Sequence, residues 1–129
     1  MLTITSKLQL DNYRKQANLL ELEQHCNANY LDTATERLAG MVSSAEADIN
    51  AENKLRDKDD KIDKTEALNY FKETDETYLA LEAYSTALET RNASIDSEMK
   101  FLNEAIDAFQ KEHENGIKDD TNFWCFGGG

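Results

Sequence analysis

The strongest constraint in this chain is an apolar repeat, with alternating steps of three and four residues, in the second half of the sequence. Nine of its twelve positions are apolar, and the alternation is never interrupted. The positions are Phe71, Thr74, Tyr78, Leu81, Ser85, Leu88, Asn92, Ile95, Met99, Leu102, Ile106 and Phe109. This spacing places all of them on one helix face and is typical of coiled coils. It predicts a helix from about Lys64 to His113, with Gly116 as its C-terminal stop.

A second, less regular repeat covers the first half of the chain and is apolar at ten of fourteen positions. The positions are Leu10, Tyr13, Ala17, Leu20, Gln24, Asn27, Leu31, Ala34, Leu38, Met41, Ala45, Asp48, Glu52 and Leu55. It predicts a helix from about Leu10 to Leu55. The chain contains no proline, so nothing of that kind interrupts either helix.

A short polar connection near residues 56–63 makes the two predicted helices antiparallel neighbours, with residue i opposite roughly residue 120 − i. We therefore expect an all-α fold, a long antiparallel helical hairpin that resembles a coiled coil. The expected organisation is an N-terminal segment (1–9), the hairpin (10–115) and a C-terminal tail (116–129). Near the middle, Gln24 and Asn27 face Asn92, either to set the register or because this level is open to water.

Each repeat forms an apolar stripe along its predicted helix, and the two stripes do not include all of the large apolar side chains. Those outside the stripes are Leu19, Leu22, Tyr30, Tyr70, Leu79, Tyr84 and Phe101. Either the chain divides into three or four helices that form a bundle, or the hairpin is completed by self-association or by a partner. The absence of a clear breaker inside either helix favours a hairpin with a partner.

The formal net charge is −12, which opposes binding to nucleic acids and to anionic membrane surfaces. No stretch approaches the roughly 20 apolar residues of a membrane span, and the N-terminus does not resemble a Sec signal. We expect a cytoplasmic protein, or one exported without a cleaved Sec signal. Cys26 occupies an apolar helix position and is expected to be buried. No catalytic constellation stands out, so we expect neither an enzyme nor a cofactor.

Residues 57–68 resemble the calcium-binding loop of an EF-hand. Asp57, Asp59, Asp63 and Glu66 would be the ligands, with calcium as the ion. Compared with a twelve-residue EF-hand loop, the stretch is two residues short, lacks the glycine and contains several lysines. The competing interpretation is a polar turn in which Asp63 or Thr65 caps the following helix.

The C-terminal tail contains the aromatic residues Phe123, Trp124 and Phe126 around Cys125, followed by three glycines. The tail either folds back onto the apolar N-terminal residues or inserts into a pocket of a partner, because aromatic side chains are frequent anchors at interfaces.

The start Thr3-Ile4-Thr5-Ser6 and the heptads of Phe71–Phe109 are similar in format to small helical proteins of bacterial type III secretion. Small size, acidic charge and the absence of proline are further shared traits. The resemblance implies paired helices and a role as a secreted substrate, structural subunit or chaperone. Cysteine and the aromatic tail depart from the usual filament subunit, and the resemblance implies no site residue.

These features predict a protein–protein interaction module, a helical structural subunit or a chaperone-like partner, that binds through its helical stripes and tail. The alternative is a calcium-responsive helical protein. The expected partner-binding residues are Leu31, Leu38, Met41, Tyr78, Leu81, Leu88, Asn92, Ile95, Met99, Leu102, Phe123, Trp124 and Phe126.

Overall fold

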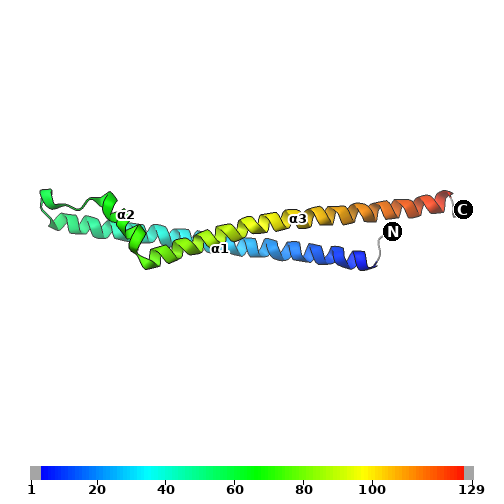
Figure 1. Ribbon diagram of the computed structural model, residues 1–129, viewed down its shortest axis with the longest axis horizontal. Helices are drawn as coiled ribbons and strands as arrows, with labels where there is room; N and C mark the ends of the chain where they lie inside the picture. The colour runs from blue at the N-terminus through cyan, green and yellow to red at the C-terminus, as the bar shows by residue number, and fades with distance from the viewer. Residues whose placement is uncertain (1–3, 127–129) are drawn as a thin grey trace. The chain divides into compact units, whose positions relative to one another are not determined.

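The computed structural model of the chain describes residues 4–126, and it describes side chains as far as residue 112. This part of the chain forms three α-helices and one short 3-10 helix, and it contains no strand. In chain order they are α1 (Ile4–Leu55), η1 (Lys58–Asp60), α2 (Lys64–Thr74) and α3 (Glu76–Phe126) (Figure 1). α1 and α3 pack against each other, so the all-α helical hairpin predicted from the sequence is confirmed.

The outer ends of the helices differ from the predicted ones. α1 begins at Ile4 rather than at Leu10. α3 continues through Gly116 to Phe126. A glycine inside a helix lowers its stability by only about 1 kcal/mol relative to alanine and does not force an end. The structure also divides the predicted second helix into α2 and α3.

Contacts divide the chain into two compact units, each of which contains part of α1 and part of α3. Residues 4–25 and 92–126 belong to one, which we call the terminal unit. Residues 26–91 form the other, the turn unit, which includes all of η1 and α2.

In the terminal unit, the first turns of α1 lie beside the later turns of α3 (Figure 1). The buried side chains along this contact are Leu10, Ala17, Ile95 and Leu102. Ile95 has no exposed surface at all. The rings of Tyr13 and Phe109 pack with their centroids 5.7 Å apart, a distance at which aromatic pairs attract each other.

A polar pair joins the two helices at the inner edge of the terminal unit. The Gln24 side-chain amide donates to the Asp96 carboxylate at 2.6 Å and to the backbone oxygen of Asn92 at 3.4 Å. The Asn92 side-chain amide donates in return to the backbone oxygen of Gln24 at 3.4 Å. Gln24 thus lies opposite Asp96, as the predicted register requires. The polar level is a set of hydrogen bonds between the helices and not a gap.

The turn unit has a thinner core. Ala34 on α1 and Tyr78 on α3 are its buried apolar residues, and the Tyr78 ring lies 5.6 Å from that of Phe71 on α2, measured between centroids. Ser85 is also buried, and its hydroxyl donates to the backbone oxygen of Leu81 at 3.1 Å. The buried hydroxyl of Ser85 therefore has its hydrogen-bond partner within α3.

The predicted stripes match the burial pattern over most of their length. In the second half every position except Thr74 is buried or half-buried, and in the first half every position as far as Ala45 is. The stripe of α1 then moves by one residue. Three predicted stripe positions are exposed, namely Asp48, Glu52 and Leu55. The half-buried residues in this part of α1 are instead Glu46, Ile49 and Asn53. An α-helix drifts by about 20° per heptad relative to a 3.5-residue repeat, and here α1 runs beside α2.

Replacement of the fully buried Ile95 by alanine should destabilise the fold by about 2–5 kcal/mol, because it removes apolar contacts and leaves a cavity. Chemical denaturation followed by circular dichroism measures this change. Leu19→Ala is the control, since Leu19 is 58% exposed and its loss should change stability by about 0.5 kcal/mol or less. Equal losses of stability in both variants would contradict the burial of Ile95 in the contact between α1 and α3.

Candidate functional site

A one-residue break separates α2 from α3. Asp75 has extended backbone angles (φ −73°, ψ 117°) and ends α2, with its N–H donating to the Phe71 oxygen at 2.9 Å. The same residue begins α3, because its carboxylate accepts from the Tyr78 N–H at 2.8 Å and its backbone oxygen accepts from the Leu79 N–H at 3.0 Å. Asp75 is therefore both the C-cap of one helix and the N-cap of the next.

An open, largely apolar groove lies in the turn unit, and residues on both sides of the break line it. Its volume is about 1020 Å³. α1 contributes Arg37, Gly40, Met41, Ser44, Ala45, Asp48 and Ile49; α2 contributes Ala67 and Phe71; α3 contributes Thr77, Ala80, Leu81 and Tyr84. A groove of this kind is the usual place for a ligand or a partner helix.

Small residues form much of the α1 wall of the groove. Gly40, Ser44 and Ala45 lie within two turns of each other and carry no large side chain. A Cβ atom added to Gly40 would meet no atom within 4 Å apart from its chain neighbours and the backbone of its own helix. The packing of the chain itself therefore does not require glycine here, although glycine weakens the helix by about 1 kcal/mol relative to alanine. The space above Gly40 is available to another molecule.

Two charged side chains complete the lining. Arg37 and Asp48 both lie on α1, and both are exposed. Among the described residues neither side chain has a hydrogen bond or an ion pair. Two basic residues elsewhere in the turn unit have acidic partners, since Lys64 pairs with Glu46 and Arg56 pairs with Glu52 at 3.2 Å.

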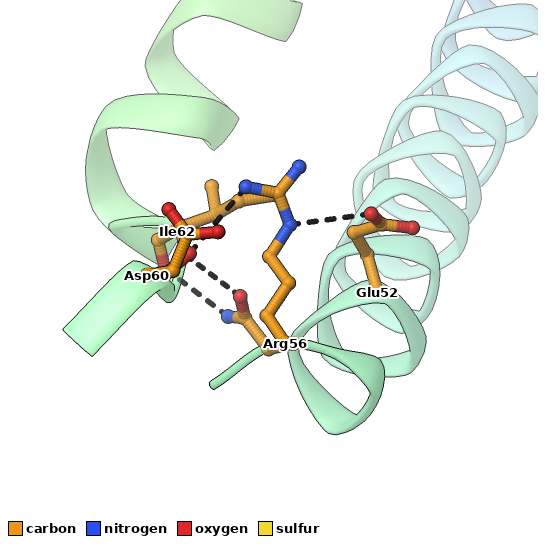
Figure 2. A network of polar contacts seen from close by, with 5 residues as sticks. Glu52, Arg56, Asp60 and Ile62 are labelled. Atoms are coloured by element: carbon orange, nitrogen blue, oxygen red, sulfur yellow. Dashed lines mark hydrogen bonds and ion pairs between the residues drawn. The ribbon is translucent and has the colours of Figure 1, made fainter. Parts of the chain in front are cut away.

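The connection between α1 and α2 is held by a compact polar network (Figure 2). The Asn53 side chain accepts from the Ile62 N–H at 2.7 Å and donates to the Ile62 oxygen at 3.1 Å. Arg56 donates to the Glu52 carboxylate at 3.2 Å and to the Asp60 backbone oxygen at 3.4 Å. One asparagine thus satisfies both backbone groups of a half-buried turn residue, which sets where α2 can begin.

Replacement of Asn53 by alanine should lower the free energy of unfolding by about 1–3 kcal/mol, because both polar groups of Ile62 lose their partner. Denaturant unfolding measures the loss. Asn50→Ala is the matched control, since Asn50 is an exposed asparagine of the same helix. If the two variants have the same stability, the network does not hold the turn.

The structure does not assemble the four acidic residues of the calcium hypothesis into a site. Among the described residues no group of three or more His, Cys, Asp or Glu side chains is placed to hold a metal ion. Asp63 instead caps α2, with its carboxylate accepting from the N–H groups of Thr65 at 3.0 Å and Glu66 at 3.3 Å. Asp57 precedes η1 without a capping side-chain bond, and Asp59 is exposed within it.

Replacement of Asp63 by alanine should cost about 0.5–2 kcal/mol of stability through loss of the helix cap, with or without calcium. Asp59→Ala, which removes a carboxylate without a capping role, should change stability little. Thermal unfolding of both variants and of the unchanged chain, with millimolar calcium and with chelator, tests this. A calcium-dependent rise in melting temperature that either substitution abolishes would restore the calcium hypothesis.

The predicted partner-binding residues have different positions in the structure. Tyr78, Ile95 and Leu102 are buried within the chain. The half-buried residues are Leu31, Leu38, Met41, Leu81, Leu88, Asn92 and Met99. Of this set, Met41 and Leu81 line the groove. The side chains of Phe123, Trp124 and Phe126 lie outside the described residues.

The large apolar residues outside the two stripes lie on the surface. All seven are exposed, from Leu79 at 42% to Tyr70 at 69%. Tyr84 belongs to the groove, and Phe101 lines a smaller groove of about 440 Å³ in the terminal unit. Cys26 is exposed, which contradicts the prediction that it is buried. It lies about 200° around α1 from the stripe position 24, so its side chain points away from α3.

The groove and the hydrogen bonds that Asn53 makes at the turn were not foreseen from the sequence. Asp75 and Asn53 carry signals that could have indicated them, since aspartate is a preferred N-cap and asparagine is frequent in turns. The chain matches no known family model, no curated protein and no solved structure. Within the described residues, no helix has the length and apolar character to span a membrane. The geometry of the chain itself is therefore the basis for a functional proposal.

Proposed function

We propose that the chain is a protein–protein interaction module, which binds a helix of another protein in the groove of the turn unit. The observation that carries this proposal is an apolar groove whose α1 wall has unused space above Gly40. Met41 and Leu81 would contact the bound helix through their exposed surface. Binding would thereby bury apolar area that the hairpin alone leaves in water.

The dimensions of the groove favour a helix over a small ligand. Its α1 wall runs from Arg37 to Ile49, which corresponds to about 18 Å of helix. That is the length of about three helical turns. The groove is open along its side and has small residues on one wall, and such a wall allows close approach of a second helix. A helix seated here would form a three-helix layer with α1 and α3.

Charge favours a different protein over a second copy of this chain. The turn unit contains 15 acidic and 8 basic residues, a formal net charge of −7, and the whole chain has −12. Two copies would repel each other as they approached. A secreted structural subunit and a chaperone-like partner are both roles that such a groove would serve, and the bound protein distinguishes them. The chain acts in this proposal by binding and not by catalysis.

A photo-crosslinking amino acid at Ala80 tests the proposal, because this residue is an exposed part of the groove lining. Ala47 is the matched position, since it is an exposed alanine of α1 outside the groove. Illumination in a lysate of the source cells, followed by mass spectrometry, should give a helical segment of one protein at Ala80 and not at Ala47.

Binding of the purified partner should then weaken at least tenfold, about 1.4 kcal/mol, when Gly40→Trp fills the groove. Circular dichroism and thermal unfolding confirm that this variant keeps its helices. The proposal is wrong if Ala80 and Ala47 capture the same proteins, if the captured protein is a second copy of this chain, or if Gly40→Trp binds as well as the unchanged chain.

A further inference from the structure

The two charged residues of the groove lie at opposite ends of its α1 wall. Arg37 and Asp48 are eleven residues apart in the sequence. Eleven residues are about three helical turns, so the two Cα atoms lie on nearly the same face of α1, about 16 Å apart along its axis. The residues of α1 that line the groove between them are Gly40, Met41, Ser44 and Ala45. The wall therefore has a positive end, a largely apolar middle and a negative end.

Both charges are available to a ligand. The ion pairs of the described residues use other side chains, and neither the Arg37 nor the Asp48 side chain makes a hydrogen bond there. They are also too far apart to pair with each other, since an ion pair requires nitrogen and oxygen within about 4 Å. A bound helix that left these charges unmatched would gain only from its apolar contacts. A helix that matched both charges would also gain an ion pair at each end of the groove.

We infer that the groove selects an amphipathic helix of about three to four turns that carries an acidic residue near one end and a basic residue about eleven positions away. The acidic residue pairs with Arg37, the basic residue pairs with Asp48, and large apolar side chains between them fill the space above Gly40. This inference rests on the proposed function and adds the chemistry of the partner. It also explains how an acidic protein discriminates among helices, because a uniformly basic helix would meet Arg37 with like charge.

Four synthetic 14-residue helical peptides with one shared apolar face test the inference. Their two end positions, eleven residues apart, carry one acidic and one basic residue, two acidic residues, two basic residues, or two glutamines. Fluorescence anisotropy at 0.15 M ionic strength measures each affinity. The acidic–basic peptide should bind the unchanged chain about 2- to 30-fold more tightly than the glutamine peptide, because each exposed ion pair contributes about 0.2–1 kcal/mol.

Charge reversals in the chain should change this preference in a defined way. Arg37→Glu should make the peptide with two basic residues the tightest, and Asp48→Lys should do the same for the peptide with two acidic residues. The double variant should again prefer the acidic–basic peptide, bound in the opposite direction. Lys15→Glu and Asp32→Lys are the controls, since they change the net charge equally at exposed positions of α1 outside the groove. They should leave the order of the four peptides unchanged.

The outcomes separate this inference from the proposed function. Equal binding of all four peptides, weakened by Gly40→Trp, would overturn the charge selection and leave helix binding in the groove intact. Failure of all four peptides would overturn the inference, while the crosslinks from Ala80 would still decide the proposed function. A change of peptide order in the control variants would show that net charge, and not the two ends of the groove, determines the preference.

Discussion

The contact between the apolar stripe of α1 and that of α3 is the interaction on which the other features depend. Each helix presents one stripe, and the stripes cover each other in both units. Ile95 is sealed from water in this contact, whereas most neighbouring stripe residues are only half-buried. A layer of two helices has no room for a second apolar face. The side chains outside the stripes therefore remain on the surface of the described part of the chain.

Polar side chains set the positions at which this contact begins, breaks and keeps its register. Gln24 and Asn92 bond across the helices, so a shift by one turn would separate them from their partners. Asn53 holds the backbone of Ile62 at the turn. Asp63 and Asp75 start the two helices that follow. The apolar stripes stabilise the contact between the helices but do not fix their register, because apolar contacts are not directional. These few polar groups fix the register and the helix ends.

Much of this arrangement could be predicted because it depends on local periodicity. The steps of three and four residues from Phe71 onward identified the buried face of α3, and they placed Tyr84 and Phe101 outside it. The register followed from the length of the turn, and Gln24 indeed lies opposite Asp96. Capping of the second helix by Asp63 was one of the two predicted possibilities, because an aspartate before an acidic first turn is a common start signal.

The groove could not be predicted, because residues on both sides of the break at Asp75 line it and the apolar repeat gives no sign of that break. The apolar repeat continues across Asp75 without a change of spacing, which predicts an uninterrupted helix. A sequence also does not distinguish an aspartate on a helix surface from one that caps a helix. The extended backbone angles of Asp75 interrupt the helix where the repeat predicts that it continues, and tertiary context can override local preference in this way. The movement of the α1 stripe to Ile49 and Asn53 is likewise not contained in the steps of three and four residues.

The break at Asp75 adds no residue to the apolar repeat, so the chain passes from α2 to α3 without a change in the spacing of its stripe positions. Phe71 and Tyr78 keep their seven-residue spacing and their ring contact across it. The change from α2 to α3 at Asp75 therefore leaves the apolar repeat in phase on both sides of the break.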